Sequence, residues 1–201
     1  MKRLFDLLFS FVGLLIFSPI ILIMALVAAL DTGSSGFFLQ DRVGQHGKLF
    51  RIIKLRTISA KTSAISKYGK FLRRSKIDEL PQLYNVLIGE MSFVGPRPDV
   101  PGYADVLKGK DRAFLKLQPG LTGLASLKYR NEEALLALER NPLQYNDTVI
   151  WPDKIRLNNW YEEHRSFGMD FLILCYTFLP FLHFNAEDFM EERGISEGKV
   201  F

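Results

Sequence analysis

LLFSFVGLLIFSPIILIMALVAAL, residues 7–30, is a run of 24 residues without a charged side chain. A straight helix needs about 20 apolar residues to cross the hydrocarbon core of a bilayer, so this run is long enough to enter a membrane. A cleaved signal peptide has an apolar region of about 7–15 residues, and the run is too long for that class. Two interpretations remain open: a helix that spans the membrane, and a helix that enters and leaves by the same face.

The flanks and the middle of this run favour the second interpretation. Lys2 and Arg3 precede the run, and several basic residues follow it. Basic flanks prefer the cytoplasmic side, and only a helix that bends inside the membrane leaves both flanks there. Pro19 removes a backbone hydrogen bond near the middle, where the hydroxyl of Ser18 can bond to the freed groups. We therefore predict a re-entrant membrane helix over residues 1–30, kinked at Ser18 and Pro19.

Charge is divided unevenly along the 201 residues, whose formal net charge is +4. Residues 1–77 carry thirteen Lys or Arg and three acids, whereas residues 78–201 carry thirteen Lys or Arg and nineteen acids. Between Arg42 and Ile77 there are eleven basic residues and no acid, a pattern that attracts phosphate, nucleic acid or an anionic membrane surface. The single cysteine excludes an internal disulfide and a cysteine-rich metal site.

Residues 31–201 are expected to form a small domain with short strands and several helices. Apolar runs at 37–40 and 49–53, separated by glycines, predict a β-hairpin. The basic stretch 59–76 has the apolar spacing of an amphipathic helix suited to lipid headgroups. The fold class is α+β and predominantly helical, with an N-terminal re-entrant helix hairpin and a small cytoplasmic domain at the membrane surface. Further expected elements are helices over 103–117, 132–140 and 161–164, a turn at 119–123, and an apolar run at 171–184 that is too short to span.

Two adjacent carboxylates, Asp78 and Glu79, directly follow the basic stretch and begin a predicted helix. Aspartate is a favourable N-cap, and Pro81 is tolerated in the first turn. Neighbouring Arg73 and Arg74 and the helix dipole are expected to hold Asp78 ionised, able to bind Mg²⁺ or to attack phosphorus. Taken alone, an Asp-Glu pair more often only caps a helix and complements its dipole.

Arg97 is a second candidate, because the two prolines beside it give a stiff backbone that could present its guanidinium to a phosphate. Motifs of nucleotide hydrolases, hydride-transfer enzymes, zinc proteases and serine hydrolases are absent from the sequence. The residues therefore favour phosphate chemistry at the Asp-Glu pair. The alternative of a different class is a membrane-anchored protein whose basic stretch binds anionic lipid or nucleic acid.

Five motifs, in this order, resemble those of the bacterial sugar transferase family, and the chain as a whole is similar to the small monotopic phosphoglycosyl transferases. The motifs are FLQDRVG (38–44), KLRTI (54–58), FLRRSKIDELPQLYNVL (71–87), MSFVGPRP (91–98) and PGLTGLA (119–125). Gln118 departs from the family pattern, in which a basic residue often precedes Pro-Gly.

The resemblance implies an enzyme that transfers a sugar 1-phosphate from a UDP-sugar to polyprenyl (undecaprenyl) phosphate and releases UMP. It implies Mg²⁺ as cofactor, a place in the bacterial inner membrane with the active site facing the cytoplasm, and no nucleic-acid partner. Asp78 would be the nucleophile and a metal ligand, forming an aspartyl-phosphosugar, and Glu79 its catalytic partner. Residues expected at the donor phosphates are Lys54, Arg56, Arg73 and Arg97, and those of a nucleotide-binding loop are Pro119, Gly120, Leu121, Thr122 and Gly123.

Overall fold

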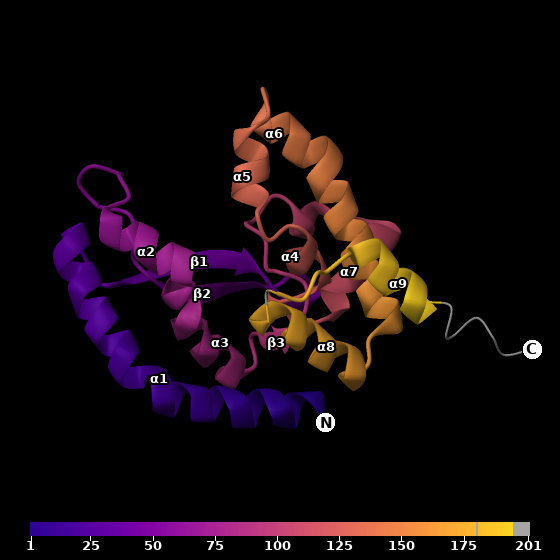
Figure 1. The fold of residues 1–201 in the computed structure, drawn as a ribbon, viewed down its shortest axis with the longest axis horizontal. Helices are drawn as coiled ribbons and strands as arrows, with labels where there is room; N and C mark the ends of the chain where they lie inside the picture. The colour runs from indigo at the N-terminus through magenta and orange to yellow at the C-terminus, as the bar shows by residue number, and fades with distance from the viewer. Residues whose placement is uncertain (180, 195–201) are drawn as a thin grey trace, which may run out of the picture. The chain divides into compact units, whose positions relative to one another are not determined.

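A computed structural model describes residues 1–179 and 181–194, and it separates into two compact units (Figure 1). Unit 1 comprises residues 1–44 and 48–92, and unit 2 comprises residues 45–47 and the described residues from Phe93 onward. Helices predominate, and the strands of the described residues form two sheets of two strands each. Pro180, inside the predicted apolar run, and the last seven residues of the predicted domain lie outside the described residues.

Unit 1 consists of one long helix, a β-hairpin and three short helices. The two strands pair antiparallel, with Phe37 opposite Leu55 and Val43 opposite Leu49. The predicted hairpin is therefore confirmed, and each strand is longer than the apolar run that indicated it. The elements are α1 (Lys2–Thr32), β1 (Phe37–Val43), β2 (Leu49–Leu55), α2 (Lys67–Ser75), the 3-10 helix η2 (Ile77–Gln82) and α3 (Leu83–Ile88).

α1 is one continuous helix that bends near its middle (Figure 1). Pro19 lies inside the helix, where it cannot donate a backbone hydrogen bond and its ring crowds the preceding turn, a usual cause of bending. The Ser18 hydroxyl donates to the carbonyl of Leu15 at 3.3 Å. The re-entrant topology that this bend would serve stays a prediction.

Each half of α1 is anchored to a different short helix of unit 1. In the first half, the guanidinium of Arg3 donates to the carbonyl oxygens of Val86 and Leu87 on α3, at 2.6 and 2.8 Å. In the second half, the hydroxyl of Tyr68 on α2 donates to the carbonyl of Met24 at 2.8 Å. Hydrogen bonds to the short helices of unit 1 thus anchor α1 on both sides of its bend.

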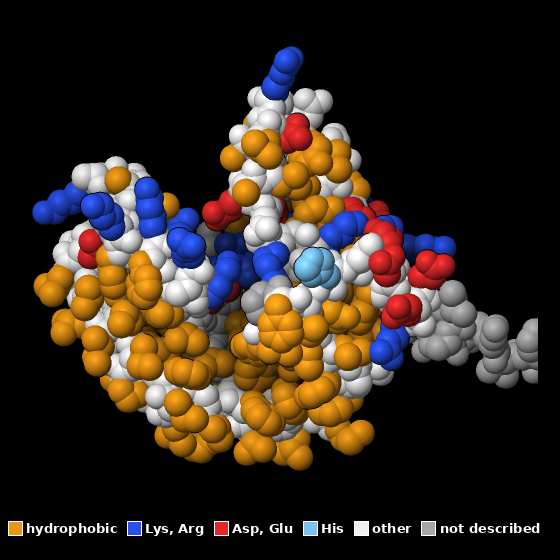
Figure 2. Space-filling view, in the orientation of Figure 1, with side chains coloured by type: hydrophobic (Ala, Val, Ile, Leu, Met, Phe, Trp, Pro, Cys, Tyr) orange, Lys and Arg blue, Asp and Glu red, His pale blue; other side chains and the backbone are white. Residues whose placement is uncertain are grey.

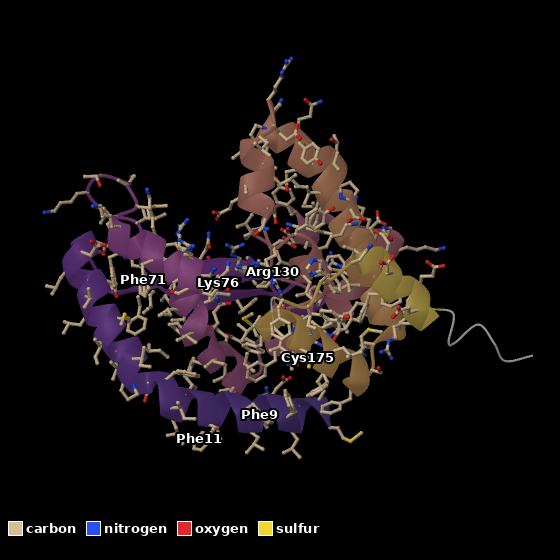
Figure 3. All side chains as sticks on the ribbon, viewed as in Figure 1. Phe9, Phe11, Phe71, Lys76, Arg130 and Cys175 are labelled. Atoms are coloured by element: carbon tan, nitrogen blue, oxygen red, sulfur yellow. The ribbon has the colours of Figure 1, made fainter. Side chains whose placement is uncertain are left out.

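The outer side of α1 is covered by hydrophobic side chains (Figure 2). Phe11 is 52% exposed and points away from the other elements of unit 1 (Figure 3). A continuous apolar surface of this kind marks an interaction with a membrane or another protein. Among the described residues, α1 is the one helix long and apolar enough to cross a membrane. Other exposed apolar side chains along it include Leu4, Leu8, Leu15, Leu22 and Leu26.

The helix expected over residues 59–76 forms only in its second half, as α2. The hydroxyl of Ser59 accepts backbone N–H groups of a turn, and serine side chains that bond in this way compete with helix formation. The helix begins where the hydroxyl of Ser66 accepts the N–H of Gly69 at 2.9 Å, and it ends at Lys76. Lys and Arg side chains gather over α2 (Figure 2). Those exposed on it are Lys67, Lys70 and Arg74.

Unit 2 is built from a second small sheet and a group of helices around one hydrophobic core. Its shorter elements are η1 (Gln45–Gly47), β3 (Ser92–Val94), which begins at the last residue of unit 1, η3 (Ala104–Val106), η4 (Gly109–Lys116), β4 (Gly120–Thr122), α4 (Leu124–Lys128), α5 (Glu132–Ala137), α6 (Pro142–Tyr145) and the π-helix η5 (Asn146–Ile150). Its longer helices are α7 (Trp151–His164), α8 (Phe167–Phe178) and α9 (Ala186–Gly194). Core residues include Val94, Leu124, Leu157, Ile173 and Phe189.

Three sequence-based boundaries in unit 2 are wrong. The helix predicted over 103–117 is replaced by two 3-10 segments, η3 and η4, because Leu107 and Lys108 between them have an extended backbone. The turn predicted at 119–123 contains the strand β4, whose partner β3 is distant in sequence. α7 begins well before the predicted segment 161–164, at Trp151, with a proline in its first turn.

Candidate active site

The Asp78–Glu79 pair lies in the first turn of η2, directly after the junction at Lys76, which is labelled in Figure 3. Lys76 adopts a left-handed conformation with φ 57°, ends α2 and begins η2. Its carbonyl accepts the N–H of Glu79 at 3.2 Å. The predicted N-cap role of Asp78 is therefore wrong, because α2 runs directly into η2 and the cap position falls on Lys76. Both carboxylates lie at a junction of two helices.

Glu79 forms a shielded ion pair with Lys54 of β2. The Lys54 Nζ atom lies 2.9 Å from Glu79 Oε1, and the two side chains are only 17% and 15% exposed. Because little water screens the pair, its electrostatic attraction is stronger than that of a surface pair. The pair joins η2 to the β-hairpin. The assignment of Lys54 to a donor phosphate stays a prediction.

Asp78 is 8% exposed, and its Oδ1 atom accepts no hydrogen bond from any described residue. Burial raises the pKa of Asp78 above its ordinary value, and the charge of Glu79 raises this pKa further. Lys54, Lys76 and Arg73 lower it without reversing the shift. Desolvation thus outweighs the attraction of the basic neighbours in setting the direction of the shift, and the expectation that these neighbours hold Asp78 ionised stays a prediction.

Buried polar atoms without a hydrogen-bond partner are rare in folded proteins, and η2 holds two of them. The second is Nε2 of Gln82, a residue that is 3% exposed. One is an acceptor and the other a donor, and both are on the six-residue segment that carries the Asp-Glu pair. Two of the six such side-chain atoms in the described residues thus lie on this segment.

Asn85, a fully buried side chain on α3 directly after η2, connects α3 to the hairpin by hydrogen bonds. Its Oδ1 accepts the N–H of Ile53 at 3.2 Å, and its Nδ2 donates to the carbonyl of Arg51 at 2.8 Å and to Glu90 Oε2 at 2.7 Å. The Asn85 amide therefore bonds to one backbone N–H and one backbone carbonyl of β2. Sequence analysis did not identify Asn85, and its one signal is a polar residue within an apolar stretch.

The two remaining basic candidates of unit 1 have different surroundings. Arg73 donates to the hydroxyl of Thr57 at 3.0 Å and lies close enough to Asp78 to lower its pKa. Arg56 donates to the carbonyls of Ser35 and Phe37, at 2.9 and 3.4 Å, near the start of β1. Unit 1 thus brings Lys54 and Arg73 to the carboxylate pair, whereas Arg56 bonds to the hairpin backbone.

Arg97 belongs to unit 2 and is exposed between two buried prolines, Pro96 and Pro98. Because both flanking residues have a fixed φ and are held in the protein, the backbone that presents Arg97 is stiff. In the loop predicted to bind the nucleotide, Leu121 is partly exposed and the other four residues are buried.

The segments that contain Arg97 and the loop are joined backbone to backbone. The N–H of Gly120 donates to the carbonyl of Pro96 at 2.8 Å, and the N–H of Gly95 donates to the carbonyl of Thr122 at 2.9 Å. A Cβ atom on Gly120 would lie 2.2 Å from the backbone nitrogen of Gly95, and one on Gly123 would lie 2.1 Å from the Gly95 oxygen. Only glycine permits this approach, so two motifs that the sequence shows separately form one piece of structure.

Comparison with known proteins identifies relatives over most of the chain. The profile described as bacterial sugar transferase matches residues 1–183. An uncharacterized sugar transferase of Bacillus subtilis (strain 168), EpsL, is 36% identical over 187 residues, which cover 88% of this chain and 85% of the relative.

Two further relatives carry more specific names, and the matches cover less than half of their length. A UDP-glucose:undecaprenyl-phosphate glucose-1-phosphate transferase of Klebsiella pneumoniae is 34% identical over 163 residues, 72% of this chain and 35% of the relative. An undecaprenyl-phosphate galactose phosphotransferase of Salmonella typhimurium is 28% identical over 204 residues, 88% of this chain and 39% of the relative. With the profile match over nearly its whole length, the chain belongs to the bacterial sugar transferase family and is a transferase.

Proposed function

We propose that this enzyme transfers a sugar 1-phosphate from a UDP-sugar to undecaprenyl phosphate, with release of UMP, as a first membrane step of glycan assembly. The observation that carries the proposal is the buried Asp78, whose Oδ1 has no hydrogen-bond partner among the described residues while basic side chains surround it. The name of the Klebsiella relative supports this donor and acceptor class, and the name of the Salmonella relative supports the acceptor.

The proposed reaction has two steps, each a substitution at phosphorus. An Asp78 oxygen forms a bond to the β-phosphorus of the UDP-sugar while the bond from that phosphorus to the bridging oxygen breaks, and UMP leaves with the bond electrons. A phosphate oxygen of undecaprenyl phosphate then attacks the same phosphorus and releases Asp78 as a free carboxylate. The unpartnered oxygen suits this role, because a hydrogen bond to it would weaken its nucleophilicity.

The basic residues have the roles that phosphoryl transfer requires. Lys54 and Arg73 would offset the negative charge of the diphosphate at Asp78, and Arg97 of unit 2 would bind a donor phosphate. Glu79 would orient the site through its ion pair with Lys54.

Magnesium is the proposed cofactor, and the residues present fit it. Mg²⁺ commonly takes one or two protein carboxylates and completes its coordination with water and substrate phosphates. The protein would contribute the carboxylate of Asp78, whose Oδ1 has no hydrogen-bond partner among the described residues; one oxygen of this carboxylate would bind the ion and the other would attack phosphorus. When bound, the ion would neutralise charge on the diphosphate.

Membrane association follows from exposed apolar surface in each unit. In unit 1 the surface is the outer side of α1. In unit 2 it lies along and after α8, where Phe171, Phe178 and Phe181 are 59%, 73% and 72% exposed. We propose that α1 is re-entrant, that the helices of residues 31–201 lie on the cytoplasmic surface of the inner membrane, and that this is where undecaprenyl phosphate is met.

The topology is tested by cysteine labelling in a Cys175→Ser background. Lys2→Cys and His46→Cys place one thiol on each side of the membrane segment. With a membrane-impermeant reagent, a re-entrant helix leaves both thiols reactive from the cytoplasmic side only. Reaction from opposite sides would establish a spanning helix.

The activity is tested by a UMP-release screen in lipid nanodiscs with undecaprenyl phosphate and Mg²⁺. The donors are the UDP derivatives of glucose, galactose, N-acetylhexosamines and a dideoxy-diamino sugar. We expect release with at least one donor and none from Asp78→Asn. No release from any of them, together with salt-sensitive binding of nucleic acid or anionic lipid, would support the membrane-anchored binding protein instead.

A further inference from the structure

Thr122 of β4 is bonded to two other elements of unit 2, one through its backbone and one through its side chain. Its carbonyl accepts the N–H of Gly95 at 2.9 Å. Its hydroxyl oxygen lies 2.8 Å from the hydroxyl oxygen of Thr177 on α8. The Thr177 hydroxyl donates its one proton to the carbonyl of Ile173 at 2.7 Å, so it accepts the proton of Thr122.

The loop 119–123 has one polar side chain, that of Thr122, and among the described residues Thr177 is its hydrogen-bond partner. Its other four residues are one proline, two glycines and one leucine, none of which has a polar side chain. β4 is three residues long, and a pair of short strands has little stability of its own. The bond to α8, a helix of twelve residues, therefore adds a side-chain attachment to a loop that is otherwise joined to its neighbours through the backbone.

The same bond acts on Arg97 through the backbone. β4 is joined to the segment before Arg97 by two backbone hydrogen bonds, from the N–H of Gly95 to the carbonyl of Thr122 at 2.9 Å and from the N–H of Gly120 to the carbonyl of Pro96 at 2.8 Å. Pro96 directly precedes Arg97. Because the φ of a proline is fixed, a displacement of the Pro96 carbonyl moves the backbone of Arg97 with it. A shift of β4 relative to α8 would thus move the loop and the Arg97 segment together.

We propose that Thr177 is a positioning residue for donor binding: its hydroxyl holds Thr122, and with it the Pro119–Gly123 loop and the Arg97 segment, in the arrangement that receives the UDP-sugar. The inference deepens the proposed function and rests on it, because that function assigns both segments to the donor. Thr177 itself touches neither substrate nor reacting atoms in this account.

The test uses the full chain in nanodiscs and measures UMP release against donor concentration for a UDP-sugar that the parent turns over. Thr177→Val keeps the shape of the side chain and removes the hydroxyl, and Thr177→Ser keeps the hydroxyl. We expect Thr177→Val to raise the KM for the donor about fivefold, the effect of one neutral hydrogen bond, with kcat within about twofold of the parent. Thr177→Ser should restore the parent KM.

Thr148→Val is the matched control. The Thr148 hydroxyl also donates to a carbonyl four residues earlier, that of Gln144 at 2.8 Å, but it lies on η5, outside β4 and α8. Its KM should equal that of the parent. A double variant, Thr122→Val with Thr177→Val, should have the KM of either single variant, because both remove one shared bond.

The outcomes separate this inference from the function on which it rests. A parent that releases UMP from no UDP-sugar contradicts the proposed function. An active parent with Thr177→Val at the parent KM overturns the positioning role and leaves the function standing, as does a lowered melting temperature and kcat with an unchanged KM. If Thr177→Val does not fold, Thr122→Val removes the same bond from the other side, and its KM decides in the same way.

Discussion

Two aspartates, one in each unit, are surrounded by basic residues and are bonded in opposite ways. Asp153 on α7 accepts hydrogen bonds from Lys128 and Tyr129 on one oxygen, both at 2.7 Å, and from Arg156 on the other, at 2.7 and 2.9 Å. Burial alone raises the pKa of Asp153, but these hydrogen bonds outweigh burial and lower it below its ordinary value. In Asp78, burial prevails and the pKa is raised.

Asp153 thus receives hydrogen bonds that offset its burial, whereas Asp78 is buried with basic groups nearby but with an oxygen that accepts no hydrogen bond from the described residues. The Asp153 network is closed: Glu187 accepts from Lys128 at 2.9 Å and from Arg156 at 2.6 Å, so the four side chains join α4, α7 and α9. The Asp78 site is open, with one oxygen left for another partner. A carboxylate whose two oxygens both accept hydrogen bonds stabilises the fold, whereas a carboxylate with an unpartnered oxygen can bind or attack a substrate.

The largest effect on the contrast between the two aspartates is expected from Asp78→Asn. The amide is not a nucleophile toward phosphorus, so UMP release should fall at least about a thousandfold. The melting temperature should stay at or above that of the parent, because a buried charge without full compensation is removed. A variant that keeps activity near the parent rate would place the chemistry elsewhere.

Asp153→Asn should have the reverse effect, with unfolding easier and catalysis retained. Removing the charge of Asp153 leaves Lys128 and Arg156 with Glu187 as their remaining acidic partner. We expect a loss of about 2 kcal/mol in the free energy of unfolding, which is less than the loss expected for a fully buried ion pair. Denaturant unfolding measures it. An unchanged midpoint would show that the network adds nothing to stability.

The contrast also has a pH dependence. The pKa of Glu187, like that of Asp153, is lowered, chiefly by the hydrogen bond from Arg156. A carboxylate whose pKa is lower in the folded state stabilises the fold above its unfolded pKa of about 4, and this stability is lost as the pH falls through the folded value. Melting temperatures should therefore fall below about pH 4. The fall should be smaller in Asp153→Asn, and equal falls in both proteins would contradict the assignment.

The smallest effect is expected at the exposed end of the network. Glu187 has a side chain that is 54% exposed, and exposed ion pairs contribute little because water and salt screen them. Glu187→Gln should cost about 0.5 kcal/mol and approach zero at high salt. A cost equal to that of Asp153→Asn would mean that burial does not set the size of these interactions.

The sequence identifies features that depend on local pattern. The length of α1, the position of Pro19, the β-hairpin and the Asp-Glu pair can all be read from runs of neighbouring residues. The Arg97 segment is also recognisable, because both prolines lie beside it.

Features that depend on distant contacts could not be predicted. The pKa of Asp78 depends on burial by elements that the sequence does not place, and Asn85 is significant only because β2 lies beside α3. The strand β4 needs a partner far along the chain, and the Asp153 network joins three helices. The left-handed Lys76 displaced the expected cap, since a non-glycine residue in that conformation gives no sequence signal.

The central claim is that the open oxygen of Asp78 becomes bonded to phosphorus. The most direct measurement incubates the parent with Mg²⁺ and a UDP-sugar it turns over, without undecaprenyl phosphate, followed by an acid quench, proteolysis and peptide mass spectrometry. The account predicts one sugar-phosphate mass on the peptide that contains Asp78, absent from Asp78→Asn and lost when undecaprenyl phosphate is added before the quench. UMP release that requires the lipid acceptor, with no adduct under any quench, would contradict it and leave Asp78 as a magnesium ligand in a direct transfer.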